Sequence, residues 1–352
     1  MNINREELLK QLEAVMPGLS TREIIEQSSC FIFKDKTVST FNDEIACSQK
    51  TSLDIEGAVQ AMPLISLLRK MKEDELEINI SNKKSQLLVR GGGGRRAGIQ
   101  MEQDITLLIE EIDKPKKWKS LPDGFTDAVT TVQDCAGKNE SQFILTCIHI
   151  DSRWVEACDN HQVARYKIKT DIKKPTLIRK ESIKYIKDLD MTKFSETRNW
   201  IHFKNSTGLI LSCRHFLVST DDSDDEKECY PTNDITKVLK VKGEPLILPK
   251  GLKKAIEKAE IFSSENVESN DLIIDLKPGK FKITGKGISG WYKEPKKSKY
   301  KGRTLQFTIP SKMLLEIVNK HSECVISSSH LKITGKNFVY VTALGIIEEK
   351  EK

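Results

Sequence analysis

An internal repeat constrains the fold of this 352-residue chain more than any other feature. Apolar residues at helical spacing predict short amphipathic helices that begin near residues 8, 125 and 252. The three sets share the spacing i, i+4, i+7 and are Leu8, Leu12 and Val15, then Phe125, Val129 and Val132, then Leu252, Ile256 and Ala259. They recur roughly every 120–130 residues, which is the size of a small domain and longer than a solenoid repeat.

A second series of helices is predicted with the same period. After each first helix comes β-rich sequence and then another apolar set. These sets are Val59, Leu64 and Leu67, then Ile178, Ile183 and Ile186, then Ile309, Leu314 and Ile317. Two independent series with one period predict three like domains, and chains of like domains are typical of symmetric assemblies.

The repeat also predicts the domain boundaries, at 1–117, 118–243 and 244–352. Charged, proline-containing connectors at 114–117 and 240–245 support them. A charged tail from about residue 345 is expected to fray.

Strands are predicted inside each block from period-two alternation that ends at turn residues. The clearest examples are 30–33, 147–150, 272–276 and the hairpin of 200–203 with 209–212. Each block therefore reads as helix, strands, helix, strands. The expected fold class is α+β, with two helices packed on a mainly antiparallel sheet in each domain.

Composition narrows the function classes only moderately. With 57 Lys and Arg against 51 Asp and Glu, the net charge of +6 permits a polyanionic partner without requiring one. No run of eighteen apolar residues predicts a membrane span, and the first residues lack the layout of a signal peptide. The eight cysteines are scattered without a C-x-x-C pair, so we expect reduced thiols in a cytoplasmic protein, with no metal or cofactor.

Three motifs resemble known sites but lack the context those sites need. The glycine run at 91–96 has no G-K-[S/T] ending and precedes a strand, so a β-turn is favoured over a phosphate loop. Residues 285–290 match G-x-G-x-x-G, but no helix follows them, which excludes a dinucleotide fingerprint. The acidic run 221–226 lacks the glycine and terminal glutamate of a calcium loop and is expected to be a solvated loop.

No catalytic constellation is found. His161 has Asp159 nearby, but no serine or cysteine is visibly positioned as a nucleophile.

Basic residues recur on the polar sides of most predicted helices. They are Arg5, Lys10, Arg69, Lys70, Lys72, Lys180, Lys184, Lys187, Lys250, Lys253, Lys254, Lys258, Lys312 and Lys320. Any one of them is an ordinary surface charge, but the repetition favours a shared positive face that contacts phosphates without sequence preference. The first helix of the middle block departs from this pattern, since Asp123, Asp127 and Asp134 make it acidic.

With these features assembled, the chain resembles the sliding clamp of bacterial DNA polymerase III, its beta subunit. Residues 155–164 (Val-Glu-Ala-Cys-Asp-Asn-His-Gln-Val-Ala) occupy the position of an Ala-Thr-Asp-Gly-His-Arg-Leu-Ala type motif in that family. Tyr230-Pro231, Leu248-Pro249 and residues 338–341 add matches in the same order. The resemblance covers the chain to about Leu344.

The resemblance implies a homodimer of three-domain protomers that closes head to tail into a ring. Helices would line the hole, sheets would form the outer wall, and the chain would form half of the ring. Enclosure of duplex DNA needs only weak phosphate contacts, which agrees with the mild net charge. By the same resemblance, DNA is contacted by Arg22, Lys138, Gln142 and Phe143, beside the helical residues Lys10, Arg69, Lys184, Lys253 and Lys254.

The resemblance also implies a pocket for short peptide motifs of a polymerase or a clamp loader. Its residues would be Ile144, Cys158, His161, Gln162, Val163, Pro231, Val238, Val339, Val341 and Ala343. The ring interface would join Ile261 and Phe262 to the partner's strand around Ile99. For each apolar residue, core packing is an alternative that the sequence leaves equally open.

Asn160 and Gln162 replace the family's usual Gly and Arg, and Thr342 replaces a usual Pro, so partner choice is expected to differ. The leading hypothesis is a non-enzymatic DNA sliding clamp that gives processivity to a replicative polymerase. The alternative is a clamp-like decoy or regulator that binds replication proteins without being loaded on DNA. An enzyme of nucleic-acid metabolism ranks third.

Overall fold

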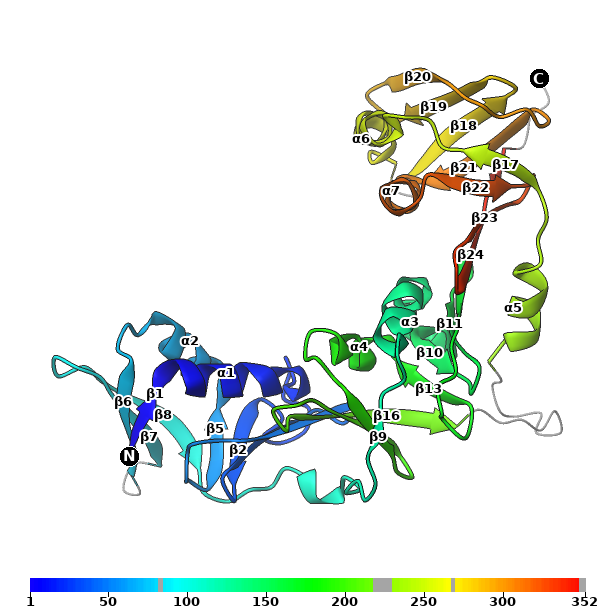
Figure 1. Ribbon diagram of the computed structural model, residues 1–352. Coiled ribbons are helices and arrows are strands. Elements are labelled where there is room, and N and C mark those ends of the chain that lie inside the picture. Colours follow the sequence, from blue (N-terminus) through cyan, green and yellow to red (C-terminus); the bar gives the residue numbers. More distant parts are fainter. Residues whose placement is uncertain (82–84, 218–229, 267–269, 348–352) are drawn as a thin grey trace. The chain divides into compact units, whose positions relative to one another are not determined.

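The computed structural model describes residues 1–81, 85–217, 230–266 and 270–347. The acidic run 221–226 and the end of the charged tail lie outside the described residues. The chain forms two compact units (Figure 1). The N-terminal unit contains Met1–Gln133, Thr146–Val155 and Ile168–Glu228. The C-terminal unit contains Asp134–Leu145, Glu156–Lys167 and Cys229–Lys352.

The N-terminal unit combines four helices with antiparallel strands. Its helices are α1 (Arg5–Val15), α2 (Ala61–Lys70), α3 (Phe125–Val132) and α4 (Lys180–Ile183), among the residues described. Its strands are β1 (Asn2–Asn4), β2 (Cys30–Lys34), β3 (Thr37–Phe41), β4 (Ile45–Lys50), β5 (Gly57–Gln60), β6 (Glu75–Ser81), β7 (Gln86–Arg90), β8 (Arg96–Glu102), β9 (Lys119–Ser120), β10 (Cys147–Ile150), β13 (Thr176–Arg179), β14 (Lys193–Glu196), β15 (Trp200–Lys204) and β16 (Ile210–Leu217). β11 (Trp154–Cys158) begins here and continues into the C-terminal unit.

Local chemistry explains where α1 begins and which side it buries. The side chain of Asn4 accepts a hydrogen bond from the backbone N–H of Glu7 at 3.0 Å, which caps the helix. Leu8, Leu12 and Val15 are fully buried, as the apolar spacing predicts. The hydroxyl of Thr40 in β3 donates to the carbonyl of Val15 at 2.5 Å, which fixes the end of the helix against the sheet.

The strands beneath α1 bury both faces. Thr40 in β3 faces α1, so its neighbour Phe41 lies on the opposite face of the pleat. On that opposite face Phe41 packs in a second cluster with Ile32 and Trp200. The connection that follows β8 covers this cluster with a set of isoleucines, Ile105, Ile109 and Ile112. Helix and connection therefore lie on opposite faces of these strands (Figure 1).

Within the N-terminal unit, the first and second blocks of the repeat share an antiparallel strand pair. β16 pairs with β15 on one side and with β4 on the other, in the register Leu211↔Cys47. Ion pairs between Arg179 and Glu44, at 2.7 Å, and between Arg214 and Asp43 lie beside this junction. On the helix side, the Phe125 ring of α3 lies 6.3 Å from the Phe203 ring of β15.

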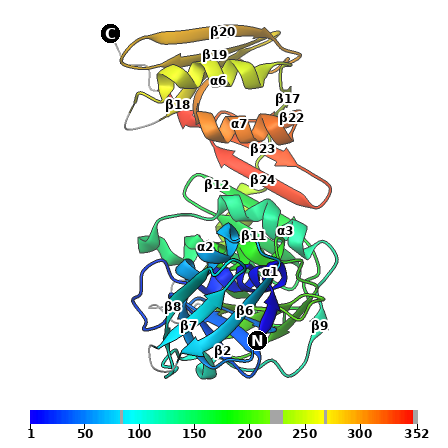
Figure 2. The same cartoon turned by 90° about the vertical axis from the view of Figure 1, so that its left-hand side faces the viewer.

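The C-terminal unit contains a second set of helices and antiparallel strands (Figure 2). Its helices are α5 (Thr232–Val238), α6 (Leu252–Ser263) and α7 (Ser311–Lys320), among the residues described. Its strands are β12 (Gln162–Lys167), β17 (Glu244–Ile247), β18 (Asp271–Lys277), β19 (Lys280–Lys286), β20 (Trp291–Lys297), β21 (Leu305–Pro310), β22 (Glu323–Ile326), β23 (His330–Thr334), β24 (Phe338–Ala343) and β25 (Gly345–Ile346).

The G-x-G-x-x-G match at 285–290 has a packing explanation. α6 crosses β19 so closely that a Cβ at Gly285 would overlap the carbonyl oxygen of Ala259. A Cβ at Gly287 would overlap the carbonyl oxygen of Phe262 in the same way. The two glycines therefore let a helix lie directly on a strand, and no phosphate loop is formed.

The structure confirms the α+β class and the three first helices, and it corrects the second series. Val59, Ile178 and Ile309 lie in β5, β13 and β21, the strands that run directly into α2, α4 and α7. In α2 the buried set is Ala61, Leu64, Ile65 and Leu68, so the predicted Leu67 is only half-buried. The repeated unit is thus a strand continued by a helix. The boundaries 117 and 243 stay a prediction.

The predicted turns form as expected at two positions. Residues 91–95 connect β7 to β8, with Gly93 and Gly94 at positive φ, so this glycine run is a β-turn. Asp35 and Lys36 connect β2 to β3 with φ values of 52° and 54°. No helix in the described part of the chain is long and apolar enough to cross a membrane.

Candidate functional site

The candidate peptide-binding residues gather in the C-terminal unit around an antiparallel strand pair. β12 pairs with β24 in the register Val163↔Val341 and Arg165↔Val339. Directly opposed residues share one side of a ladder, so these four side chains lie on the same side. Val163 and Val341 are 5% and 1% exposed, whereas Val339 is half-buried.

A buried ion pair attaches α5 to this side of the ladder. The guanidinium of Arg165 contacts the Glu156 carboxylate of β11 at 2.6 Å and donates to the Thr236 hydroxyl of α5 at 3.1 Å. Thr232 of α5 donates to the other oxygen of Glu156 at 2.9 Å. Glu156 is 0% exposed, so the charge of the pair is satisfied internally. We use the name α5 face for the half-buried residues Pro231, Val238 and Val339, together with Val163 and Val341 on the same side of the ladder as Val339.

Cys158 adjoins the α5 face but stays buried. It lies two residues after Glu156 on β11, and the buried Tyr230, which precedes α5, is close enough to influence its pKa. Burial raises the pKa of the Cys158 thiol to about 11, and it raises the pKa of Tyr230 well above the usual range. Both groups therefore stay protonated at neutral pH, and the site offers neutral contacts beside the Glu156–Arg165 pair.

Gln162 lies on the other side of the ladder from Val163. Its amide donates to the carbonyl of Asp134 at 3.0 Å, and its oxygen accepts from the Tyr340 hydroxyl at 3.1 Å. Its opposed residue Thr342 is fully buried, and the Thr342 hydroxyl contacts the sulfur of Met313 at 2.9 Å. The structure thus separates Gln162 from the α5 face, although the resemblance groups them.

The remaining candidates lie at the end of the ladder. His161 is exposed, and its carbonyl accepts from the N–H of Ala343 at 2.7 Å. Asn160 donates to the Gln142 side chain at 3.1 Å, and Ile144 is half-buried in the 3-10 helix Glu140–Thr146 that contains Gln142. These side chains lie beside the ladder end and not on the α5 face.

The candidate DNA contacts on the helices are all exposed, but two of them are already paired. Arg69 of α2 contacts Glu13 of α1 at 2.8 Å, and Lys184 pairs with Glu181. Lys10 of α1 and Lys253 and Lys254 of α6 project from the helix sides opposite the buried residues. Because acidic neighbours partly neutralise Arg69 and Lys184, the exposed sides of these helices carry only a weak positive charge.

Arg5, grouped by the sequence with the basic helix face, has a structural role. Its guanidinium donates to the carbonyls of Glu73 and Leu68 at 2.9 and 3.3 Å, and its side chain is 12% exposed. It therefore holds the start of α1 against the end of α2.

The non-helical DNA candidates lie on exposed turns. Arg22 is exposed in the loop after α1, next to Ile24, which is 88% exposed. Lys138 and Gln142 are exposed around the 3-10 helix Glu140–Thr146, and Phe143 is half-buried there.

The candidate interface residues differ in exposure. Ile261 is 63% exposed and Phe262 is half-buried at the end of α6. Ile99 is only 6% exposed, so its side chain belongs to the core of its own unit. In the described residues, 96–100 of β8 pair with β7 alone, and β20 pairs with β19 alone. Both strands therefore present an open edge.

Sequence reasoning missed two exposed apolar residues in the turn that lies against Phe262. Ile288 and Trp291 are 87% and 63% exposed at the turn between β19 and β20, and Gly290 lies against the Phe262 ring. Glu265 accepts from the backbone N–H of Ser289 at 2.7 Å, which holds this turn against the end of α6. The signal was the indole of Trp291 directly after the glycine-rich segment 285–290, which the sequence analysis considered only as a dinucleotide motif and rejected.

Comparison with solved structures identifies the fold. The DNA polymerase sliding clamp of Pseudomonas aeruginosa superposes with a TM-score of 0.79 at 15% identity, over 99% of each chain. The DNA polymerase III beta subunit of Thermotoga maritima gives 0.79 at 12% identity, again over 99% of each chain. The Bartonella birtlesii sliding clamp, solved with bound griselimycin, gives 0.82 at 14% identity over 99% of each chain. The chain has the sliding-clamp fold.

No protein-family model and no curated protein sequence matches the chain. The likeness to sliding clamps is therefore one of fold, carried from end to end of the chain. At 12–15% identity the helix-and-sheet framework is retained while most side chains differ.

Proposed function

We propose that the chain is the protomer of a homodimeric DNA sliding clamp, in which three domains of about 1–117, 118–243 and 244–352 form half of a closed ring. The observation that carries this proposal is the superposition on sliding clamps over 99% of each chain. A fold retained over 99% of each chain supports the assembly that this fold forms in those proteins.

The surface charge supports holding by enclosure. Lys10, Lys253 and Lys254 supply exposed cations, while Arg69 and Lys184 are partly neutralised by acidic neighbours. A tight electrostatic binder would keep its cations unpaired, because affinity rises with each phosphate neutralised. A ring that encircles duplex DNA needs only weak contacts from these residues, together with Arg22, Lys138, Gln142 and Phe143.

The α5 face supports recognition of a polymerase or clamp loader through a short peptide. Pro231, Val238 and Val339 offer apolar area on a base that the Glu156–Arg165 pair keeps rigid. A rigid, partly exposed apolar surface can bind an extended peptide through a few of the peptide's apolar side chains. Gln162 and Asn160 would adjust specificity from beside the ladder end.

The open edges of β8 and β20 support head-to-tail closure of the ring. Ile261, Phe262, Ile288 and Trp291 would supply apolar contacts, while Ile99 would hold β8 in position from inside its own unit. Such a contact is heterologous and closes by two-fold rotation.

One experiment separates the clamp from its alternative, a decoy that binds replication proteins without loading. The protein is loaded onto nicked circular DNA with a clamp loader and ATP, and the circle is then linearised. A sliding clamp stays on the circle and leaves through the free ends. Retention after linearisation would instead indicate an electrostatic binder, and failure to load would indicate the decoy. The decoy is favoured by the altered residues Asn160 and Gln162 and by the acidic α3, with Asp127 exposed.

A further inference from the structure

The open edge of β20 has one position that cannot donate a hydrogen bond. At one end of its ladder with β19, the N–H of Ser298 donates to the carbonyl of Gly279 at 3.0 Å. At the other end, the N–H of Gly287 donates to the carbonyl of Gly290 at 2.9 Å. Even-numbered residues of β20 therefore point their N–H and C=O groups to β19, and odd-numbered residues point theirs to the open edge. Pro295 is among the odd-numbered residues, and a proline has no N–H to offer there.

The open edge of β8 is formed by even-numbered residues. The N–H of Met101 donates to the carbonyl of Ser85 at 2.9 Å. Likewise, the N–H of Gly91 donates to the carbonyl of Arg95 at 3.0 Å. Odd-numbered residues of β8 therefore bond to β7, and even-numbered residues point outward, although Glu102 already pairs with β5. Among the residues described, the backbone groups at the open edge belong to Arg96, Gly98 and Gln100.

The two edges also match in the faces of their sheets. Tyr292 of β20 lies opposite Gly285, the glycine that α6 crosses, and the ammonium of Lys258 in α6 lies 5.7 Å from the centre of the Tyr292 ring. Even-numbered residues of β20 thus lie on the face that α6 covers. On β8, the odd-numbered Ile99 is 6% exposed and faces the buried side of its sheet. Antiparallel pairing of the two open edges sets even-numbered β20 residues opposite odd-numbered β8 residues, so the two buried faces lie on the same side.

We propose that β20 of one protomer pairs antiparallel with β8 of its partner, in the register that sets Lys293 opposite Gly98. This inference rests on the proposed ring and specifies how its two halves join. Antiparallel pairing continues the pattern of the β7–β8 and β19–β20 pairs on either side of the junction. The other opposed residues are Trp291 with Gln100, Tyr292 with Ile99, Glu294 with Ala97, and Pro295 with Arg96.

The charge of Arg96 favours this register over its neighbours. Only shifts by two residues keep the outward backbone groups facing each other. One such shift sets Lys293 opposite Arg96, and the other sets Lys297 opposite Arg96. Like charges directly opposed across a strand pair are destabilising. In the proposed register the residue opposite Arg96 is the uncharged Pro295, and Lys293 lies opposite a glycine.

A second pair of like charges does not change this order. The next pair along the ladder, Lys296 with Arg95, has like charges in the proposed register. Each of them is already neutralised within its own chain. Arg95 pairs with Glu73, and the ammonium of Lys296 contacts the Glu294 carboxylate at 2.6 Å. No ion pair reaches Arg96 in the part of the chain that the structure describes, so its charge decides between the registers.

Pro295 favours the same register. It lies at the end of the proposed ladder, and its carbonyl still accepts from the N–H of Arg96. The shift that sets Pro295 opposite Gly98 would leave the Gly98 carbonyl without a donor in the middle of the ladder, which costs the free energy of a lost hydrogen bond. The opposite shift moves Pro295 past the start of β8 and shortens the ladder.

The register also accounts for the exposure of Trp291. Its side chain is 63% exposed in the single chain. In the proposed pair it lies opposite Gln100 and diagonal to Gly98, where the absence of a side chain leaves space for the indole. Aromatic residues that cover a glycine of an edge strand help to fix the register of a strand pair.

The test is disulfide crosslinking between two copies of the full chain. Three double variants are compared: Ala97→Cys/Glu294→Cys, Ala97→Cys/Tyr292→Cys and Ala97→Cys/Lys296→Cys. Each reports one register, because its two cysteines are directly opposed only in that register. The described native cysteines are buried, and the parent protein is oxidised alongside as the control. The readout is a covalent dimer on a non-reducing gel after treatment with oxidised glutathione.

Ala97→Cys/Glu294→Cys is expected to crosslink at least about tenfold faster than the other two variants. Opposed residues that exchange no backbone hydrogen bonds have Cα atoms about 4.5 Å apart, which a disulfide can span. Diagonal neighbours are about 7–8 Å apart, which is too far without backbone movement. Thermal melting checks that each variant is folded, and sedimentation velocity checks that it is dimeric before oxidation.

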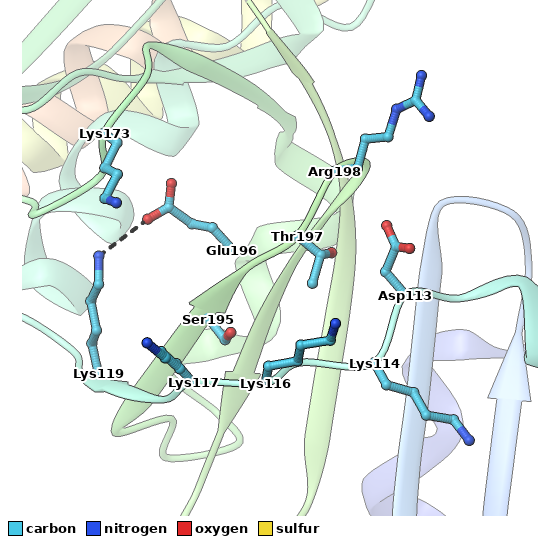
Figure 3. A pocket seen from close by; sticks show the side chains of 10 residues that line it. All are labelled: Asp113, Lys114, Lys116, Lys117, Lys119, Lys173, Ser195, Glu196, Thr197 and Arg198. Carbon is cyan, nitrogen blue, oxygen red and sulfur yellow. Dashed lines mark hydrogen bonds and ion pairs between the residues drawn. The ribbon is translucent and has the colours of Figure 1, made fainter.

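A second measurement needs no added cysteine. Arg96→Glu replaces like charges by opposite charges beside Lys293 and Lys297, which lie diagonal to Arg96, so the dimer should dissociate at a concentration about two- to tenfold lower. The effect should fade at high salt. The matched control is Lys116→Glu, the same change of charge at an exposed lysine of the connection 113–119 (Figure 3), which belongs to neither edge. It should leave the dimer affinity within about twofold of the parent's.

Fastest crosslinking through Tyr292→Cys or Lys296→Cys would overturn the register, as would an Arg96→Glu dimer no tighter than the parent's. A dimeric parent protein in which none of the three variants crosslinks would overturn the strand pairing and leave the proposed clamp intact. A parent protein that stays monomeric would contradict the proposed ring itself, and the register with it.

Discussion

At the scale of single residues, the C-terminal unit depends on one buried charge pair. Glu156 is fully buried, and Arg165 joins it to α5 through Thr236. The pair links the neighbouring strands β11 and β12 to α5, which is distant from both in sequence. Breaking a buried pair from one side is costly, because the remaining charge has no water to solvate it.

We therefore expect Arg165→Ala to destabilise the C-terminal unit by about 3–5 kcal/mol, with Glu156 left uncompensated. The loss should appear as a lower thermal midpoint and as weaker peptide binding at the α5 face. Arg303→Ala, an exposed arginine in the same unit, should change stability by less than about 0.5 kcal/mol. Equal midpoints for the two variants would contradict a structural role of the pair.

A second residue-scale prediction concerns the approach of α6 to β19. Gly285→Ala forces a Cβ into the backbone of Ala259, so we expect a destabilisation of about 1–3 kcal/mol. Gly92→Ala is the matched control, because a Cβ at that glycine meets only the side chain of Glu73, at 4.0 Å. Thermal unfolding of both variants measures the difference. A Gly285→Ala variant as stable as Gly92→Ala would show that α6 moves freely away from the strand.

At the scale of elements, helices with a clear apolar stripe could be predicted from the sequence. Leu8, Leu12 and Val15 sufficed for α1, because nothing but a helix aligns that spacing. The second series was assigned less well, since β5, β13 and β21 run into their helices without a loop. Strand and helix residues such as Val59 and Leu64 then form one apolar run with no visible boundary.

The candidate site was predictable only in part, for a geometric reason. A resemblance to a family assigns a role to a whole segment. Along a strand, however, successive side chains point to opposite faces of the sheet, so only every second residue can reach a given site. Val163 therefore reaches the α5 face, while Gln162 beside it points to Asp134. Likewise Ile99 belongs to a strand with an open edge, and yet its own side chain is buried.

The element-scale prediction tests the α5 face as a peptide site. Val238→Asp/Val339→Asp introduces two charges into an apolar contact, so binding of the clamp-binding peptide from a cognate polymerase should weaken at least tenfold. Calorimetry or anisotropy measures the affinity. Gln162→Ala is the control on the opposite side of the ladder and should have a smaller effect. A larger effect of Gln162→Ala would assign the site to the ladder end.

At the scale of the whole molecule, the proposed ring requires two chains. Phe262→Glu introduces a charge beside Ile261 and Trp291, and we expect it to convert the dimer to a monomer in sedimentation velocity. Lys254→Glu, a charge change on the same helix that lies outside the proposed interface, should leave the dimer intact. An unchanged mass for Phe262→Glu would refute this interface assignment.

The central claim is that two copies of the chain enclose duplex DNA, and single-particle electron microscopy of the protein with a short duplex tests it most directly. The account predicts a closed, two-fold symmetric ring of two chains, with the helices α1 and α6 facing a hole through which the duplex passes. A solitary chain bound to the side of the duplex, or a dimer without a hole, would contradict it.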